Sequence, residues 1–116
     1  KKELTVRMLR AAQDREWFDV RKMIFMGADA GAQDVESAGM SALHYAAMEG
    51  NADMVSYLLS NGANPCVPTH DGHTALHWAA ASGSEEVVRS LVRAGASVMA
   101  RSHDDIQPIE MAVLFE

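Results

Sequence analysis

The feature that most constrains this chain is a long segment that occurs twice at a fixed spacing. Residues 39–64 read GMSALHYAAMEGNADMVSYLLSNGAN, and residues 72–97 read GHTALHWAAASGSEEVVRSLVRAGAS, 33 residues further along. A unit of this size cannot bury its own apolar face, so each unit must pack against its neighbours. The sequence therefore predicts a stack of similar units, which offers an elongated surface with no built-in catalytic chemistry.

The repeat continues on both sides of these two copies. The run DIQPIEMAV, residues 105–113, begins 33 residues after Gly72. Residues 11–29 align with residues 46–64 at an offset of 35, so the first connection holds two extra residues, which we place within 31–37. The sequence predicts one domain over residues 1–116, with units at about 4–35, 36–68 and 69–101 and a partial unit at 102–116.

Each unit has the pattern of two helices joined by a tight turn. Ser41 and Thr74 stand before the first helices, where a hydroxyl accepts backbone N–H groups. Gly50 and Gly83 follow these helices, where a left-handed residue ends a helix. The second helices carry apolar residues at i, i+1, i+4 and i+5, which predicts one buried stripe in each. These residues are Met54, Val55, Leu58 and Leu59, and then Val87, Val88, Leu91 and Val92.

On these residues the chain resembles the ankyrin repeat. The family pattern runs roughly G-x-T-P-L-H-x-A-A-x-x-G-H-x-x-V-V-x-L-L-L-x-x-G-A-D, and the two regular units match it at most positions. The resemblance implies an all-α fold, an ankyrin-repeat solenoid of stacked helix-turn-helix units with projecting β-turn or hairpin loops. It also implies a concave face, formed by the first helices and the turn tips.

The first unit departs from this pattern at the turn between its helices. Arg15 stands where the pattern has glycine, and Trp17 and Phe18 follow it. Because a left-handed Arg is strained, we expect this turn to differ from the others. Alternatively, the aromatic pair acts as a lid over the N-terminal end of the stack.

Charge and cysteine content narrow the classes of partner. The formal net charge is −6, which disfavours binding to nucleic acid or to an anionic membrane surface. No apolar run approaches the ~20 residues of a membrane span, so we expect no membrane insertion. Cys66 is the single cysteine and forms no intrachain disulfide, which suits a reducing compartment. We therefore expect an intracellular, cytoplasmic protein, with the nucleus as an alternative.

By resemblance, the chain is a protein–protein interaction module that binds a protein or peptide on its concave face. Tyr45 and Trp78 follow the structural histidines, and we expect each to be partly buried with its polar tip at the groove. The mixture of acids, histidines and apolar residues suits a peptide with apolar anchors and some basic residues. The implied contact residues at the helix ends are Gln13, Asp14, Met48, Glu49, Ala81, Ser82 and Phe115, and those in the turns are Ser37, Met40, His70, Asp71, His73, His103, Asp104 and Ile106.

Two of these expectations keep alternatives. Met48 is equally compatible with packing between units, because Met fills irregular gaps. The turn histidines titrate near neutral pH, so the sequence leaves the pH dependence of binding open. It also leaves the oligomeric state open, with a monomer favoured for this segment.

Histidine and cysteine spacing raise the possibility of a metal site or a nucleophile. His44 and His77 occupy the family's structural position, where the resemblance implies hydrogen bonds to the adjacent turn. The remaining histidines lack a defined fourth ligand, so we predict no metal and no cofactor. Cys66 has neither a base nor a second cysteine near it in sequence, so we predict no catalysis.

Two rival functions remain. The partial last unit leaves Ile109, Met111, Leu114 and Phe115 uncovered, which favours a segment of a longer protein or a following segment that covers this end. In that case the repeats regulate, or recruit substrate to, a larger enzyme or channel. The remote rival is a metal-dependent or cysteine-dependent enzyme within this chain.

Overall fold

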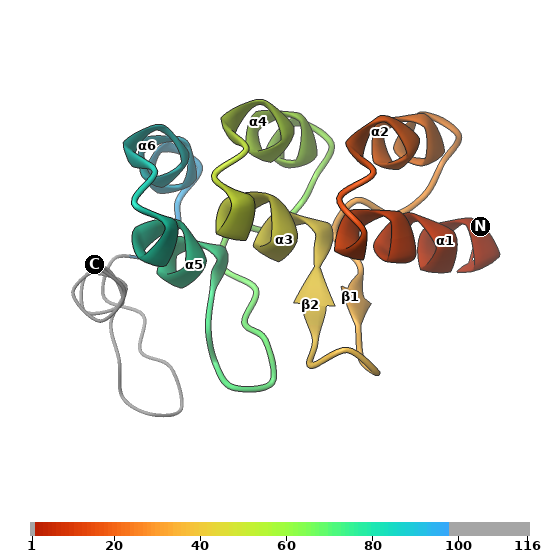
Figure 1. Cartoon of the computed structure of the whole chain (residues 1–116), viewed down its shortest axis with the longest axis horizontal. Helices are drawn as coiled ribbons and strands as arrows, with labels where there is room; N and C mark the ends of the chain where they lie inside the picture. The colour runs from red at the N-terminus through yellow and green to blue at the C-terminus, as the bar shows by residue number, and fades with distance from the viewer. Residues whose placement is uncertain (1, 98–116) are drawn as a thin grey trace.

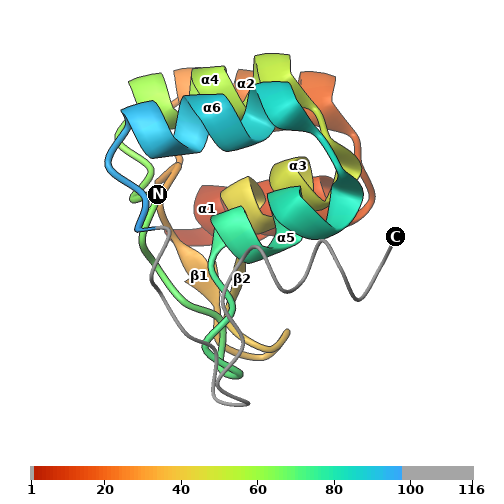
Figure 2. The same ribbon diagram turned by 90° about the vertical axis from the view of Figure 1, so that its left-hand side faces the viewer.

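Three helix-turn-helix pairs follow one another along residues 2–97, the part of the chain that the computed structural model describes. The inner helices α1, α3 and α5 lie side by side in one layer, and the outer helices α2, α4 and α6 form a second layer (Figure 1, Figure 2). The elements are α1 (Lys2–Gln13), α2 (Trp17–Phe25), β1 (Gln33–Asp34), β2 (Met40–Ser41), α3 (Ala42–Glu49), α4 (Ala52–Ser60), α5 (Ala75–Ser82) and α6 (Glu85–Arg93).

This arrangement confirms the predicted all-α solenoid. The segments between the pairs project to one side of the inner helices (Figure 1). The partial unit expected at 102–116 lies outside the described residues.

The inner helices begin and end where the repeat pattern predicts. The Ser41 hydroxyl accepts a hydrogen bond from the His44 backbone N–H at 3.4 Å and so caps α3. Gly50 and Gly83 end α3 and α5 in the left-handed conformation, at φ 76° and 74°. A residue with a Cβ is strained there, so glycine is favoured at this turn.

The turn of the first unit does not differ from these two, contrary to our expectation. Arg15 has φ 61°, the left-handed conformation of its glycine counterparts. The Glu16 backbone N–H donates to Ala11 O at 2.8 Å, just as the Asn51 N–H donates to Ala46 O at 2.9 Å. The backbone hydrogen bonds that close the turn therefore outweigh the strain of a Cβ.

The first connection forms a short hairpin in which β1 and β2 pair antiparallel, with Gln33 opposite Ser41. Ala38 and Gly39 close it at φ 62° and 75°. The second connection contains no strand, although its Thr69 N–H donates to His73 O at 2.8 Å. The two extra residues of the first connection thus extend it into a hairpin. The His70 N–H donates to Ala38 O at 2.8 Å and links the two projections.

The core lies between the layers and along the stack. Leu43 and Leu76 of the inner helices are each 1% exposed, and Leu58 and Leu91 of the outer helices are fully buried. Ala46 and Ala79 are also fully buried, and their small side chains let neighbouring inner helices approach closely. The predicted stripe on the outer helices is narrower than expected, because Val92 is 43% exposed.

Candidate partner-binding surface

The stacking brings the predicted helix-end residues into one row. The inner helices lie side by side, so equivalent positions at their carboxyl ends become neighbours (Figure 2). Met48 and Ala81 are half-buried at these ends, and the others are exposed. The residues of the row are Gln13, Asp14, Met48, Glu49, Ala81 and Ser82.

The predicted turn residues lie on the two projections. His70 and Asp71 are exposed, while Ser37 and His73 are half-buried. The His70 ring lies against Gly39 so closely that a Cβ there would come within 2.7 Å of its Cδ2 atom. Gly39 therefore serves both the left-handed turn and the contact between the two projections.

A hollow of about 700 Å³ lies between one side of α1 and the first hairpin. Gln13 and Ser37 both line it, together with Leu9, Asp34 and Val35. The structure thus brings one predicted helix-end residue and one predicted turn residue to the same hollow.

We expected Met40 near a turn tip, but it is buried, with 8% of its surface exposed. It belongs to β2 and pairs with Asp34, next to the cap residue Ser41. This pairing holds Met40 at the base of the hairpin, while residues 35–39 form the tip. Met40 is therefore a core residue and leaves the candidate surface.

Trp78 and Tyr45 are half-buried as predicted, but the tip of Trp78 is not at the groove. Its Nε1 atom is buried without a hydrogen-bond partner, and its ring centroid lies 5.3 Å from that of His73. Because Nε1 is buried, Trp78 offers no hydrogen-bond donor to a partner. For Tyr45, burial and then Asp34 raise the pKa of the hydroxyl above its usual range.

The histidines of the regular units tie each inner helix to its turn, as the resemblance implied. The Ser41 N–H donates to Nδ1 of His44 at 2.9 Å, which leaves Nε2 as the protonated nitrogen, donating to Val67 O at 3.0 Å. The Thr74 N–H donates to Nδ1 of His77 at 3.0 Å. Burial lowers the pKa of His44 to about 4, so this ring is neutral at physiological pH. Within residues 2–97 no group of three or more His, Cys, Asp or Glu side chains is placed to hold a metal ion.

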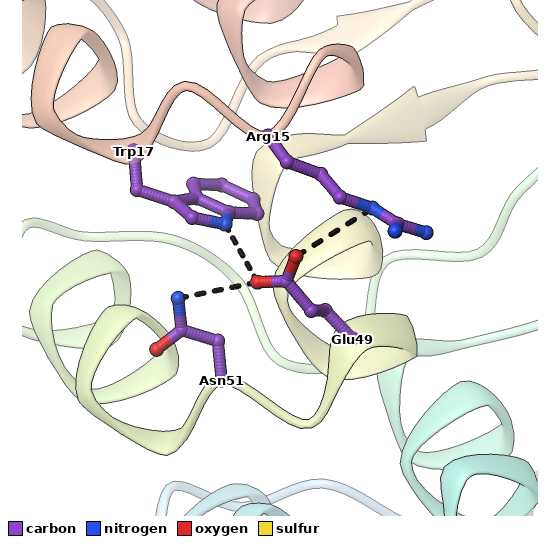
Figure 3. Close-up of polar contacts among 4 residues, drawn as sticks. All are labelled: Arg15, Trp17, Glu49 and Asn51. Atoms are coloured by element: carbon purple, nitrogen blue, oxygen red, sulfur yellow. Dashed lines mark hydrogen bonds and ion pairs between the residues drawn. The ribbon is translucent and has the colours of Figure 1, made fainter.

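Glu49 has a role that the sequence did not indicate. Its carboxylate accepts a 2.7 Å hydrogen bond from Nε1 of Trp17 and lies 3.6 Å from Nε of Arg15 (Figure 3). The Asn51 amide also donates to it at 3.4 Å. Glu49 therefore connects the first two units, although we placed it on the partner surface alone. The feature of the sequence that could have pointed to this bridge is the pair of departures from the repeat pattern at Arg15 and Trp17, which stand at one turn.

The alternative of Trp17 and Phe18 as a joint lid is wrong. Trp17 is half-buried against the second unit, whereas Phe18 is 78% exposed. The predicted contact residues His103, Asp104, Ile106 and Phe115 lie outside the described residues.

Comparisons with known proteins identify the repeat. A family model described as ankyrin repeats (3 copies) matches residues 8–102, which is most of the chain. No curated protein sequence gives a significant match. In the described part of the chain, no helix combines the length and the apolar character needed to cross a membrane.

Proposed function

Because this chain belongs to the ankyrin-repeat family, we propose that it binds a protein or peptide segment along its concave face. Ankyrin repeats are generally protein-interaction modules and are typically non-catalytic. The concave face is defined here by the carboxyl ends of α1, α3 and α5 and by the tips of the two projections, residues 35–39 and 68–73. The same proposal places the protein inside the cell, where the exposed Cys66 thiol stays reduced.

The distribution of charged residues along the sequence indicates the charge of the partner segment. Between residues 23 and 88 the sequence has eight Asp and Glu residues and no Lys or Arg. Seven of the ten basic residues stand at or before residue 22. The two projections lie within the segment without cations, and they expose Glu36 and Asp71 near their tips.

The partner segment is therefore basic, with apolar side chains between its charges. Lys or Arg of the partner faces Glu36 and Asp71, and complementary charge speeds and orients association. Half-buried Met48 supplies adaptable apolar area within the row of helix ends. Since these charges are exposed, salt screens them and weakens binding.

Neither a catalytic function nor a cofactor is part of the proposal. The Cys66 thiol donates to Gly95 O at 3.4 Å, and its backbone N–H donates to the Asn64 side chain. These contacts describe a turn residue that makes structural hydrogen bonds, and activation of a thiol nucleophile requires a neighbouring base.

The test begins with affinity capture of partners and mass spectrometry, followed by titration of a purified partner. The test variant reverses two projection charges, Glu36→Lys with Asp71→Lys. The matched control reverses two charges on the outer helices, Asp53→Lys with Glu86→Lys. We expect the test variant to lose about tenfold or more in affinity and the control to lose little. Equal losses at unchanged stability would show that the concave face is not the binding surface.

A further inference from the structure

The outer helix of the first unit exposes two large aromatic side chains on one face. Phe18 is 78% exposed and Phe25 is 88% exposed. They are seven residues apart, or two helical turns, which separates them by about 10 Å along the axis of α2. Arg21 and Lys22 lie between them on the same exposed side. We call Phe18, Arg21, Lys22 and Phe25 the α2 outer face.

The other two units show that the fold does not require these phenylalanines. The position of Phe18 is occupied by Asp53 in α4 and by Glu86 in α6. The position of Phe25 is occupied by Ser60 and by Arg93. All four counterparts are exposed, so the same position on the same helix is otherwise polar and solvated.

Stacking of another unit does not account for the phenylalanines either. Helix α4 lies between α2 and α6 in the stack, yet Asp53 and Ser60 remain exposed (Figure 1). This position thus points away from both neighbours. A unit packed on the free side of α2 would leave Phe18 and Phe25 in solvent, and exposed apolar residues gathered in this way mark an interaction site.

The basic residues of this face favour an acidic partner. The Arg21 guanidinium lies 4.6 Å from the centroid of the Tyr57 ring, and the Tyr57 hydroxyl donates to Arg21 O at 3.4 Å. These contacts hold the Arg21 charge in place beside the phenylalanines. Lys22 is exposed next to it, and the only acid within the helix is Asp19.

We propose that the α2 outer face is a second docking surface, which binds an acidic amphipathic helix of a partner protein. Apolar side chains of that helix pack around the two phenylalanine rings, whose spacing matches two turns of a helix laid along α2. Its carboxylates pair with Arg21 and Lys22. The proposal is independent of the concave face, whose projections are acidic and take a basic segment. The two surfaces together allow one chain to bridge two partners of opposite charge.

The probe is a synthetic amphipathic peptide of about 18 residues built from Leu and Glu, long enough for a helix to form on binding. Two control peptides replace every Glu with Lys, or every Leu with Ser. The isotope-labelled full chain is titrated with each peptide and followed by amide chemical shifts. The test variant is Phe18→Asp with Phe25→Ser, the residues that α4 carries, and the control variant is Asp53→Asn with Ser60→Ala.

We expect the Leu/Glu peptide to shift amides of α2 and to bind the test variant about tenfold more weakly, with the control variant unchanged. Because both phenylalanines are exposed, the melting temperature of the test variant should match that of the parent chain. Absence of α2 shifts at millimolar peptide, or equal binding by the test variant, would overturn the proposal.

Two further measurements separate the alternative occupants. Sedimentation with phosphatidylserine vesicles that depends on Phe18 and Phe25 would assign the face to a membrane and overturn the proposal. Self-association in sedimentation velocity that the test variant abolishes would assign the α2 outer face to a second copy of this chain. That result would also overturn the proposal. Neither effect is expected.

Discussion

The indole Nε1 of Trp17 donates a 2.7 Å hydrogen bond to Oε1 of Glu49, 32 residues further along the chain. The donor begins the outer helix of the first unit, and the acceptor ends the inner helix of the second. Helix α2 contacts α4 less extensively than α4 contacts α6. The contacts of Arg21 with Tyr57 connect the first two outer helices, and the Trp17 bridge ties α2 to the inner helix of the second unit.

Removal of the Glu49 charge tests this bridge. Glu49→Gln weakens the bonds from Trp17 and Arg15. We expect a loss of about 1–2 kcal/mol in the free energy of unfolding, because a hydrogen bond to a charged group contributes about 1.5–3 kcal/mol and one to a neutral group about 0.5–1.5 kcal/mol. The measurement is chemical denaturation, with hydrogen exchange of α2 as a local readout. Glu85→Gln is the matched control, since Glu85 pairs only with Arg89 on an exposed helix face in the described structure. The control should lose under about 0.5 kcal/mol, and an equal loss would contradict the bridge.

The left-handed backbone of Arg15 indicates that a substitution at this position can stabilise the chain. That backbone is strained, and the pair of Arg15 with Glu49 is largely exposed on the Arg15 side. We expect Arg15→Gly to stabilise the chain by up to about 1 kcal/mol, because relief of the strain exceeds the lost pair and the added entropy of the unfolded chain. Arg15→Ala keeps the strain and removes the pair, so it should be slightly destabilising. A glycine variant less stable than the parent would show that the Glu49 contact dominates.

His44 gives a pH dependence with a defined sign. Its pKa is about 4 in the folded chain against 6.5 for the unperturbed group, so between these values the unfolded chain binds more protons. Stability therefore falls as the pH drops from about 6.5 to about 4, by up to about 3 kcal/mol from this residue. The check is the free energy of unfolding of the parent chain and of His44→Gln, each measured at pH 7 and at pH 4.5. The penalty of the substitution should be larger at pH 7 than at pH 4.5, and a constant penalty would contradict the assignment.

The sequence predicted the repeated backbone well, because its signals are local. A cap residue such as Ser41 and a left-handed glycine such as Gly50 act within one helix, and the 33-residue period places them. The structural role of His44 also followed from its position in the unit. Such features need no knowledge of how neighbouring units face each other.

Features that depend on contact between units were not predicted. Met40 stands beside a turn in the sequence, but the pairing of two strands buries it. The bridge from Trp17 to Glu49 depends on the lateral offset of two stacked helices, which no periodicity encodes. The exposure of Phe18 and Phe25 indicates a docking surface because their polar counterparts on α4 and α6 lie in solvent, and this requires the structure of all three units.

Hydrogen exchange of the chain with and without a captured partner tests the concave-face proposal most directly. We predict slower exchange at residues 35–39 and 68–73 and at the carboxyl ends of the inner helices, with α4 and α6 unchanged. Charge reversal at Glu36 and Asp71 should remove that protection. Protection confined to the outer helices, and unaffected by those substitutions, would contradict the proposal that the concave face binds the partner.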